Sequence, residues 1–182
     1  MENVVKTAII LASSREYGNT QQLANLYMEH EPSDLFNLTD YSISVFDYQH
    51  RNQHDDFLGL INTLVEYDHL VFATPVYWYS MSAQLKIFID RLSDLLTIEK
   101  KLGRALKGKS CSILATGADN EVPECFVAAF KLTANYFGIK FTSTFYCSCK
   151  DDFIVQEHVY NLTTYLAMEC SNGARQTQKI IE

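Results

Sequence analysis

The chain has 182 residues, 47% of them hydrophobic, which predicts one compact domain over residues 1–182 with a sizeable core. The formal net charge of −7 argues against a nucleic-acid partner, because a phosphate backbone requires a basic protein face. The chain shows no apolar run near the roughly 20 residues that span a bilayer and no secretory signal pattern, so we expect a cytoplasmic protein without membrane attachment.

An apolar strand and a helix open the chain. Residues 4–12, VVKTAIILA, form a nearly continuous apolar run rich in β-branched residues. Such a run is typical of a strand covered on both faces in a parallel sheet. Leu23, Leu26 and Tyr27 follow at helical spacing, and Pro32 ends the helix that they predict.

Shorter segments lead to the second helix. DLFNL (34–38) and YSISVF (41–46) are short strand candidates. Residues 47–56, DYQHRNQHDD, are wholly polar or aromatic, which predicts a connecting loop. Apolar residues at helical spacing from Phe57 to Val65 then predict a helix.

A buried strand and a long helix occupy the middle of the chain. HLVFATPVY (69–77) predicts the strand, and Pro75 ends its regular pairing because proline has no amide proton to donate. Apolar residues share one helical face over 81–96, and Ser80 or Ser82 is expected to cap that helix.

The last third repeats the alternation of strand and helix. SCSILAT (110–116) predicts a strand, and a helix is expected over 122–137 with Gly138 at its C-terminal stop. IKFTSTFYCS (139–148) predicts the last strand, and a final helix is expected to end at the Asn-Gly pair 172–173.

This alternation predicts an α/β fold, namely a doubly wound five-stranded parallel sheet of order 2-1-3-4-5 with helices on both faces. In such sheets ligands bind at the carboxyl ends of the strands, near the point where the strand order reverses. The loops expected to form a site are therefore SSREYGNT (13–20), TPVYWYS (74–80) and TGADNEVPE (116–124).

The first loop carries groups that an anion requires, because free amides at a helix N-terminus and side-chain hydroxyls attract phosphate. These groups come from Ser13, Ser14, Arg15, Gly18, Asn19 and Thr20. The loop lacks the GK[ST] of a Walker loop and has one glycine where the dinucleotide fingerprint has three. The alternative is ordinary capping, in which Asn19 and Thr20 begin a helix and bind nothing.

The second and third loops suggest a flat ligand. Tyr77, Trp78 and Tyr79 lie together after a buried strand, where they could form walls for an aromatic ring or pack against a helix or a second subunit. Gly117 would let the backbone approach a ligand closely, while Asp119 could contact the ligand or cap the next helix. A phosphate-bearing ring system without a Walker lysine fits flavin mononucleotide (FMN) best.

At these same loops the sequence resembles a known family. SSREYGNT, the long stretch TPVYWYSMSAQLKIFIDRLSDL (74–95) and ATGAD (115–119) resemble the flavodoxin-like NAD(P)H-dependent FMN reductases and quinone reductases, in the right order along essentially the whole chain. The resemblance implies a single flavodoxin-like FMN-binding domain. It also implies NADPH or NADH as co-substrate, a small acceptor such as a quinone or free flavin, and a homodimer or homotetramer with FMN near a subunit interface.

The resemblance assigns cofactor-binding residues by position, and it assigns no catalytic side chain or metal ligand. The phosphate contacts would be Ser13, Arg15, the amide of Gly18, Asn19 and Thr20. The isoalloxazine ring would be bordered by Pro75, Val76, Tyr77 and Trp78 on one edge and by Thr116, Gly117 and Asp119 on the other. Tyr79 would help to shape the pocket in which the two substrates alternate.

Two other classes of protein stay open at this stage. One is a flavodoxin-type electron carrier that binds FMN without nicotinamide turnover, and the other is a nucleotide-binding module on the same fold without redox function. The five cysteines show no CxxC spacing, so we expect reduced, mostly buried thiols and no iron–sulfur cluster. Neither NADH nor NADPH is favoured, because no ribose-phosphate pocket is placed.

Two features outside the three loops receive interpretations of their own. His50 and His54 share the loop 47–56 with several aspartates, but such loops are usually solvated and no metal site is predicted. The loop could instead be a flap beside the flavin or an interface segment. Asp90 and Arg91 are interpreted as a surface or interface salt bridge.

Overall fold

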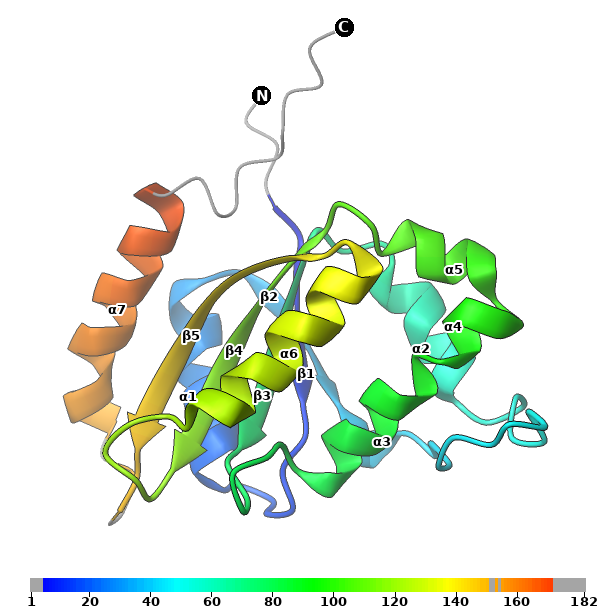
Figure 1. Ribbon diagram of the computed structural model, residues 1–182. Helices are drawn as coiled ribbons and strands as arrows, with labels where there is room; N and C mark the ends of the chain where they lie inside the picture. The colour runs from blue at the N-terminus through cyan, green and yellow to red at the C-terminus, as the bar shows by residue number, and fades with distance from the viewer. Residues whose placement is uncertain (1–4, 151–152, 154, 172–182) are drawn as a thin grey trace, which may run out of the picture.

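A five-stranded parallel sheet forms the centre of the computed structural model, which describes residues 5–150, 153 and 155–171 (Figure 1). Its strand order, β2-β1-β3-β4-β5, confirms the predicted flavodoxin-like topology. The strands are β1 (Thr7–Leu11), β2 (Ser33–Asn37), β3 (His69–Pro75), β4 (Ser110–Gly117) and β5 (Lys140–Ser148).

Helices cover both faces of this sheet and create two cores. The helical elements are α1 (Asn19–His30), η1 (Leu38–Asp40), α2 (Phe57–Leu64), α3 (Ala83–Arg91), α4 (Asp94–Thr97), α5 (Lys100–Ala105), α6 (Glu124–Phe137) and α7 (Val155–Ser171). One face packs on α1 and α7, and the other packs on α2, α3 and α6 (Figure 1). All five residues of β1 are buried, because its side chains alternate between the two cores.

The segment 41–46 is not a strand, which corrects the prediction made for YSISVF. Its Ser42 amide donates to the Asp56 carboxylate at 2.7 Å, and its Ser44 amide donates to Asp55 at 2.9 Å. Polar side chains from the end of the following loop therefore take the amides that a neighbouring strand would otherwise bond. The sequence alternates as a strand does, but the backbone amides of this segment bond to carboxylates and not to a neighbouring strand.

The predicted long helix over 81–96 is two helices. Ser82 caps α3, its hydroxyl accepting a hydrogen bond from the Leu85 amide at 3.3 Å, which confirms one of the two expected caps. The helix ends at Arg91, and α4 starts at Asp94 after a tight turn. Arg91 and Asp94 form an ion pair across this break.

The C-terminal part agrees with the predicted pattern. Gly138 ends α6 in the left-handed conformation, with φ of 69°, as its position after an apolar helix predicts. α6 itself begins at Glu124, two residues later than predicted. The predicted end of the final helix, at residues 172–173, lies outside the described residues.

Candidate active site

The three predicted loops meet at the carboxyl edge of the sheet because β1, β3 and β4 are neighbours in it (Figure 1). The Val76 amide donates to the Thr116 carbonyl at 2.8 Å, which joins the second loop to the third. The hydroxyls of Thr20 and Thr116 lie 2.7 Å apart and are buried, which joins the first loop to the third. This last contact links residues 96 positions apart, and no local pattern in the sequence indicates it.

The N-terminus of α1 has the character of an anion site. Gly18 is its N-cap, and no side chain caps it. The first backbone bond of the helix runs from the Gln22 amide to the Gly18 carbonyl, and within the described chain the amides of residues 19–21 find no acceptor. The side chains of Asn19 and Thr20 therefore do not cap the helix, contrary to the capping alternative. Amides left free in this way, at the positive end of a 12-residue helix, suit a phosphate group.

Arg15 folds back over this N-terminus. A Cβ on Gly18 would lie 2.9 Å from the Arg15 Cβ, so the close approach of the two residues requires glycine at position 18. Arg15 is exposed and takes part in none of the ion pairs found in the described residues. Ser13 is buried, and its Oγ accepts a weak hydrogen bond of 3.4 Å from the Arg15 amide. The Arg15 side chain thus starts beside Gly18 at the helix N-terminus, and within the described residues its guanidinium has no carboxylate partner.

The aromatic loop is a tight hairpin held in an unfavourable backbone conformation. Tyr77 and Ser80 exchange two backbone hydrogen bonds of 2.9 and 3.0 Å, and the two residues between them have positive φ, 48° at Trp78 and 65° at Tyr79. Turns of this kind usually carry Asn-Gly, because a side chain with a Cβ is strained at positive φ. Trp78 is 94% exposed at the tip. Strain and exposure together mark a segment shaped for binding.

Replacing Trp78 with glycine should raise the stability of the cofactor-free chain by about 1 kcal/mol, because glycine adopts positive φ without strain. The same change should weaken binding of the flavin, because it removes an aromatic side chain that the isoalloxazine ring could pack against. Urea unfolding and a flavin titration measure the two effects. Tyr160 is a matched control, since it is 75% exposed in the regular helix α7. Glycine there should destabilise the chain by about 0.5–1 kcal/mol and leave flavin binding unchanged.

The third loop is shaped by β5 as well as by β4. A Cβ on Gly117 would lie 2.6 Å from the Tyr146 hydroxyl, so this glycine is required by a neighbouring side chain and not only by a ligand. That hydroxyl donates to the Asp119 carbonyl at 2.8 Å and fixes the start of the loop. Burial and the nearby Asp119 carboxylate raise the Tyr146 pKa, so it stays a neutral donor. Asp119 is exposed and does not cap α6, whose N-cap is Pro123.

Cys149 lies beside the loop 13–20, at a place where the sequence predicted no functional group. Its side chain contacts the Asn19 side chain, and its amide donates to the Gly117 carbonyl at 2.6 Å. Burial raises the Cys149 pKa, as it raises that of Cys147 to about 12, so both are neutral thiols. The four cysteines whose side chains are described are free, but Cys125 is exposed, an exception to the expected burial.

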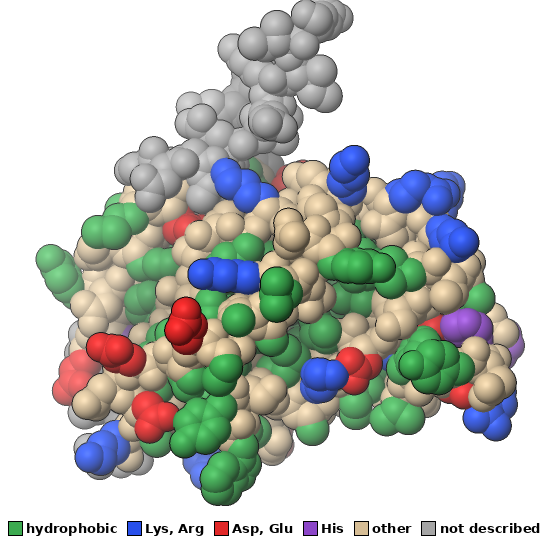
Figure 2. All heavy atoms as spheres, viewed as in Figure 1, with side chains coloured by type: hydrophobic (Ala, Val, Ile, Leu, Met, Phe, Trp, Pro, Cys, Tyr) green, Lys and Arg blue, Asp and Glu red, His purple; other side chains and the backbone are tan. Residues whose placement is uncertain are grey.

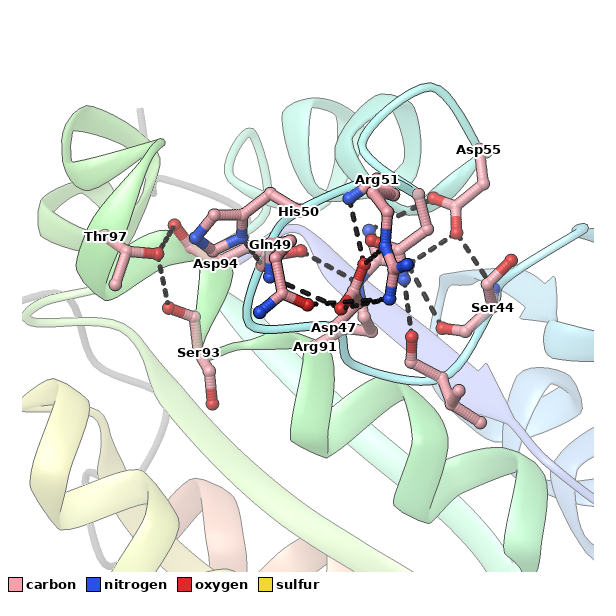
Figure 3. A network of polar contacts seen from close by, with 12 residues as sticks. Ser44, Asp47, Gln49, His50, Arg51, Asp55, Arg91, Ser93, Asp94 and Thr97 are labelled. Carbon is pink, nitrogen blue, oxygen red and sulfur yellow. Dashed lines mark hydrogen bonds and ion pairs between the residues drawn. The ribbon is translucent and has the colours of Figure 1, made fainter.

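The loop 47–56 is anchored by a buried arginine (Figure 3). The Arg91 side chain is fully buried, and it donates to both Asp55 oxygens, to Asp94 at 2.8 Å and to the Ser44 carbonyl at 3.1 Å. On the far side of Asp94, His50 Nδ1 lies 2.9 Å from the carboxylate. Arg91 is therefore no surface ion pair, which corrects the earlier interpretation.

The partner once assigned to Arg91 is engaged elsewhere. Asp90 pairs with Lys86, one helical turn earlier on α3, at 2.5 Å and in solvent. Periodicity alone could have indicated the difference, because Arg91 lies three residues after Phe88 on the buried stripe of α3. A charge on a buried stripe requires buried partners, and here one comes from the next turn, Asp94, and the other from the loop 47–56, Asp55.

Neither a metal site nor a membrane-spanning helix is found in the described residues. Across the part of the chain that the structure describes, no three His, Cys, Asp or Glu side chains come together to hold a metal ion. None of its helices has the length and apolar character needed to cross a membrane.

Comparison with solved structures supports the fold. A Trp repressor binding protein from Bacillus subtilis is 22% identical with a TM-score of 0.69, and the match covers 94% of this chain and 99% of that one. An FMN-dependent NADH-azoreductase from Bacillus anthracis, solved with FMN, is 12% identical with a TM-score of 0.65, covering 93% and 99%. An NADPH-quinone reductase from P. pentosaceus is 18% identical with a TM-score of 0.64, covering 97% and 99%.

Sequence comparison finds similarity to flavin-containing proteins and to one family model. Protein YwqN of Bacillus subtilis, whose name describes an NAD(P)H-dependent FMN-containing oxidoreductase, is 32% identical over 124 residues, which cover 64% of this chain and 68% of YwqN. An iron–sulfur flavoprotein of Archaeoglobus fulgidus is 28% identical over 100 residues, covering 48% of this chain and 46% of that protein. The model of the NADPH-dependent FMN reductase family matches residues 5–142.

The fold and the carboxyl-edge loops define a flavodoxin-like protein in which an uncapped helix N-terminus and an aromatic hairpin share one edge of the sheet. The family model matches residues 5–142, most of the chain, and the chain belongs to the NADPH-dependent FMN reductase family. It is thus an oxidoreductase that depends on FMN and a reduced nicotinamide. The residues present fit this cofactor, because the uncapped N-terminus of α1 suits a phosphate and the hairpin offers exposed ring faces.

Proposed function

We propose that the chain transfers reducing equivalents from NADPH or NADH to a small acceptor such as a quinone or a free flavin, at a site formed by the loops 13–20, 74–80 and 116–124. The observation that carries the proposal is the uncapped N-terminus of α1 lying beside a strained, exposed aromatic hairpin at one edge of the sheet. The family assignment supplies the cofactor, and the acceptor is inferred from the exposed aromatic surface.

In this proposal each loop has a separate task. The free amides at the start of α1, with Ser13, Arg15, Asn19 and Thr20, hold the FMN phosphate. The backbone from Pro75 to Trp78 borders one edge of the ring, while Thr116, Gly117 and Asp119 border the other. The buried bond between the Thr20 and Thr116 hydroxyls keeps the phosphate loop and the ring loop at a fixed separation.

When bound, FMN would supply the redox chemistry, the transfer of a hydride from the nicotinamide and of electrons to the acceptor. The protein binds, orients and shields the reactants, so no side chain is proposed as an acid or base. Trp78 and Tyr79, both exposed, provide ring faces on which a flat nicotinamide or quinone can stack in turn.

A single set of measurements tests the proposal. The purified chain is examined by visible spectroscopy with and without added FMN, and oxidation of NADH and NADPH is then followed with a quinone or free flavin as acceptor. We expect a bound-flavin spectrum and acceptor-dependent oxidation. Flavin binding without nicotinamide oxidation would contradict the reductase and match an electron carrier. Failure to bind flavin would contradict both.

Replacing Arg15 with alanine should weaken FMN binding by about tenfold to a hundredfold, the effect of losing a hydrogen bond to a charged group. Fluorescence titration of the cofactor-free chain measures the change. Lys86→Ala, which removes an exposed cation on α3, is the control and should bind FMN as the wild type does. An unchanged affinity in the Arg15 variant would mean that amides and hydroxyls hold the phosphate alone.

A further inference from the structure

Exposed charges are divided between the two edges of the sheet. The edge at which the strands start carries cations, whereas the carboxyl edge carries carboxylates where β4 leads into α6. In Figure 2 blue side chains line the top of the molecule, and red side chains gather at its lower left, where α6 begins in Figure 1. The proposed flavin site thus lies at the negative edge. The exposed cations of the other edge are Lys6, Lys100, Lys101, Arg104, Lys107 and Lys140.

The exposed carboxylates belong to two of the three loops of the proposed site. The first loop carries Glu16, and the third carries Asp119, Glu121 and Glu124; these four are here called the acidic rim. None of them takes part in an ion pair within the described residues. Charges without a partner set up a field in the solvent around them. A reactant that approaches the site therefore meets a negative potential.

Two contacts hold the third loop in place beside the aromatic hairpin. The Cys125 thiol donates to the Tyr79 carbonyl at 3.6 Å, so the start of α6, with Glu124, adjoins the hairpin. The Tyr146 hydroxyl donates to the Asp119 carbonyl at 2.8 Å. The segment 119–125 is therefore held against the hairpin at one end and against β5 at the other.

Cations close to these carboxylates in the fold do not cancel the charge of the acidic rim. In the proposed function Arg15 holds the FMN phosphate, which carries up to about two negative charges and offsets the guanidinium. Lys131 of α6 lies over the Phe141 ring, 5.5 Å from its centroid. Lys150, exposed just after β5, is a single charge. A surplus of negative charge stays at the rim when FMN is bound.

We propose that the acidic rim makes the site select its electron acceptor by charge, so that a neutral flat ring is reduced faster than an anionic one of the same ring structure. The rim carboxylates act through their field on the approach of the acceptor and bind no ligand themselves. In the transfer, two electrons and two protons leave the reduced cofactor and reach the acceptor, which departs in its dihydro form. The acceptor selection rests on the proposed function, whereas the negative field at the hairpin does not.

Trp78 allows the field to be measured without turnover, because it is the one tryptophan of the chain and is 94% exposed at the tip of the hairpin. Its fluorescence in the cofactor-free chain is quenched with iodide, with caesium and with neutral acrylamide at constant ionic strength. Relative to a free tryptophan amide, caesium should quench at least about twofold better than iodide, because a negative field attracts cations and repels anions. Equal relative quenching by the two ions would overturn the inference.

Neutral variants identify the residues responsible. Glu121→Gln with Glu124→Gln should reduce the difference between caesium and iodide by at least about half. Glu29→Gln with Glu66→Gln is the matched control, since Glu29 lies near the end of α1 and Glu66 just before β3. The control removes the same net charge from the opposite edge of the sheet and should keep the wild-type difference. An equal response of both double variants would contradict the assignment to the rim, and circular dichroism verifies that both fold.

Reoxidation of the loaded chain tests the selection of the acceptor. The FMN-loaded chain is photoreduced without nicotinamide and mixed with one of two quinones that share a ring and a side chain, one ending in a hydroxyl and the other in a carboxylate. Stopped-flow absorbance follows the return of oxidised flavin. In about 0.01 M salt the neutral quinone should react at least about fivefold faster, and in about 1 M salt, where screening acts within about 3 Å, the two rates should converge. Equal rates in low salt, or a difference that salt does not change, would overturn the selection.

The outcomes separate this inference from the proposed function. A chain that discriminates between the two quinones but oxidises neither NADH nor NADPH would overturn the proposed reductase and leave the charge selection in place. A negative field at Trp78 without discrimination would overturn the selection alone. If the chain binds no FMN, the proposed function and the selection fail together, and the quenching of Trp78 still decides whether the hairpin lies in a negative field.

Discussion

Replacing Arg91 with methionine should lower the free energy of unfolding of the cofactor-free chain by about 3–5 kcal/mol, the largest loss expected from any single substitution outside the apolar core. The side chain is fully buried, and its partners Asp55 and Asp94 are 9% and 1% exposed. Methionine fills much of the space but leaves both carboxylates without the guanidinium that bridges them. The cost is that of two desolvated charges, not of one lost contact.

The loss should appear as a lower urea midpoint together with faster proteolysis in the loop 47–56, since Arg91 is its anchor. Lys86→Ala removes an exposed ion pair of the same helix and should cost less than about 1 kcal/mol. If the methionine variant fails to fold, Arg91→Lys serves instead. It keeps the charge but lacks the forked donors that bridge two carboxylates, so it should fall between wild type and methionine. Equal stability of Arg91→Lys and wild type would contradict the proposed anchor.

The pH dependence of stability supplies a second readout. Burial by itself would raise the Asp55 pKa, but hydrogen bonds from Arg91 and from the Ser44 and Phe57 amides outweigh it and hold the pKa below its usual value. Because the pKa of Asp55 is lower in the folded chain than in the unfolded chain, its ionised form stabilises the fold. This stabilisation is complete above the unfolded-state pKa, near 4, and is lost as the pH falls below it through the folded-state pKa. The stability difference between wild type and Arg91→Met should therefore narrow below about pH 4, as measured by urea unfolding at successive pH values.

Most of the fold was predictable from the sequence because each strand between helices is a short apolar run with clear stops. β1, β3 and β4 are buried on both faces, so most of their residues are apolar, and Gly138 ends α6 where the pattern stops. The three site loops follow from the same pattern, since the carboxyl ends of neighbouring parallel strands must meet at one edge. The family resemblance adds the cofactor, which the pattern alone only suggests.

What escaped prediction are contacts between residues distant in sequence. YSISVF alternates as a strand does, yet its amides are taken by Asp55 and Asp56, whose partners a local reading does not reveal. Similarly, one of the two buried ion pairs of Arg91, that with Asp55, comes from a loop more than 30 residues earlier. The hairpin at Trp78 lacks the Asn-Gly pair that usually indicates such a turn in a sequence. A strained position of this kind has no sequence signal, because it is selected for function and not for local backbone propensity.

Replacing Gly117 with alanine should cost about 1–3 kcal/mol of stability and weaken FMN binding, because the new Cβ would lie 2.6 Å from the Tyr146 hydroxyl and 3.2 Å from its Cε2. To make room, Tyr146 must shift, and its 2.8 Å bond to the Asp119 carbonyl is the contact it loses first. The loop that borders one edge of the proposed ring site then loses its support. Urea unfolding and a flavin titration measure the two effects.

Two further variants test whether the clash with Tyr146 is the cause. Gly59→Ala is the matched control, since nothing lies within 4 Å of a Cβ at that position in α2, and it should stabilise the chain by about 0.5–1 kcal/mol. Tyr146→Phe removes the hydroxyl that the new methyl would strike. In the double variant Gly117→Ala with Tyr146→Phe, the loss should be clearly smaller than the sum of the two single losses. If the stability losses of the two single variants simply add in the double variant, the clash with Tyr146 is not the cause. Gly117 would then be required for its backbone conformation or for close approach of the ligand.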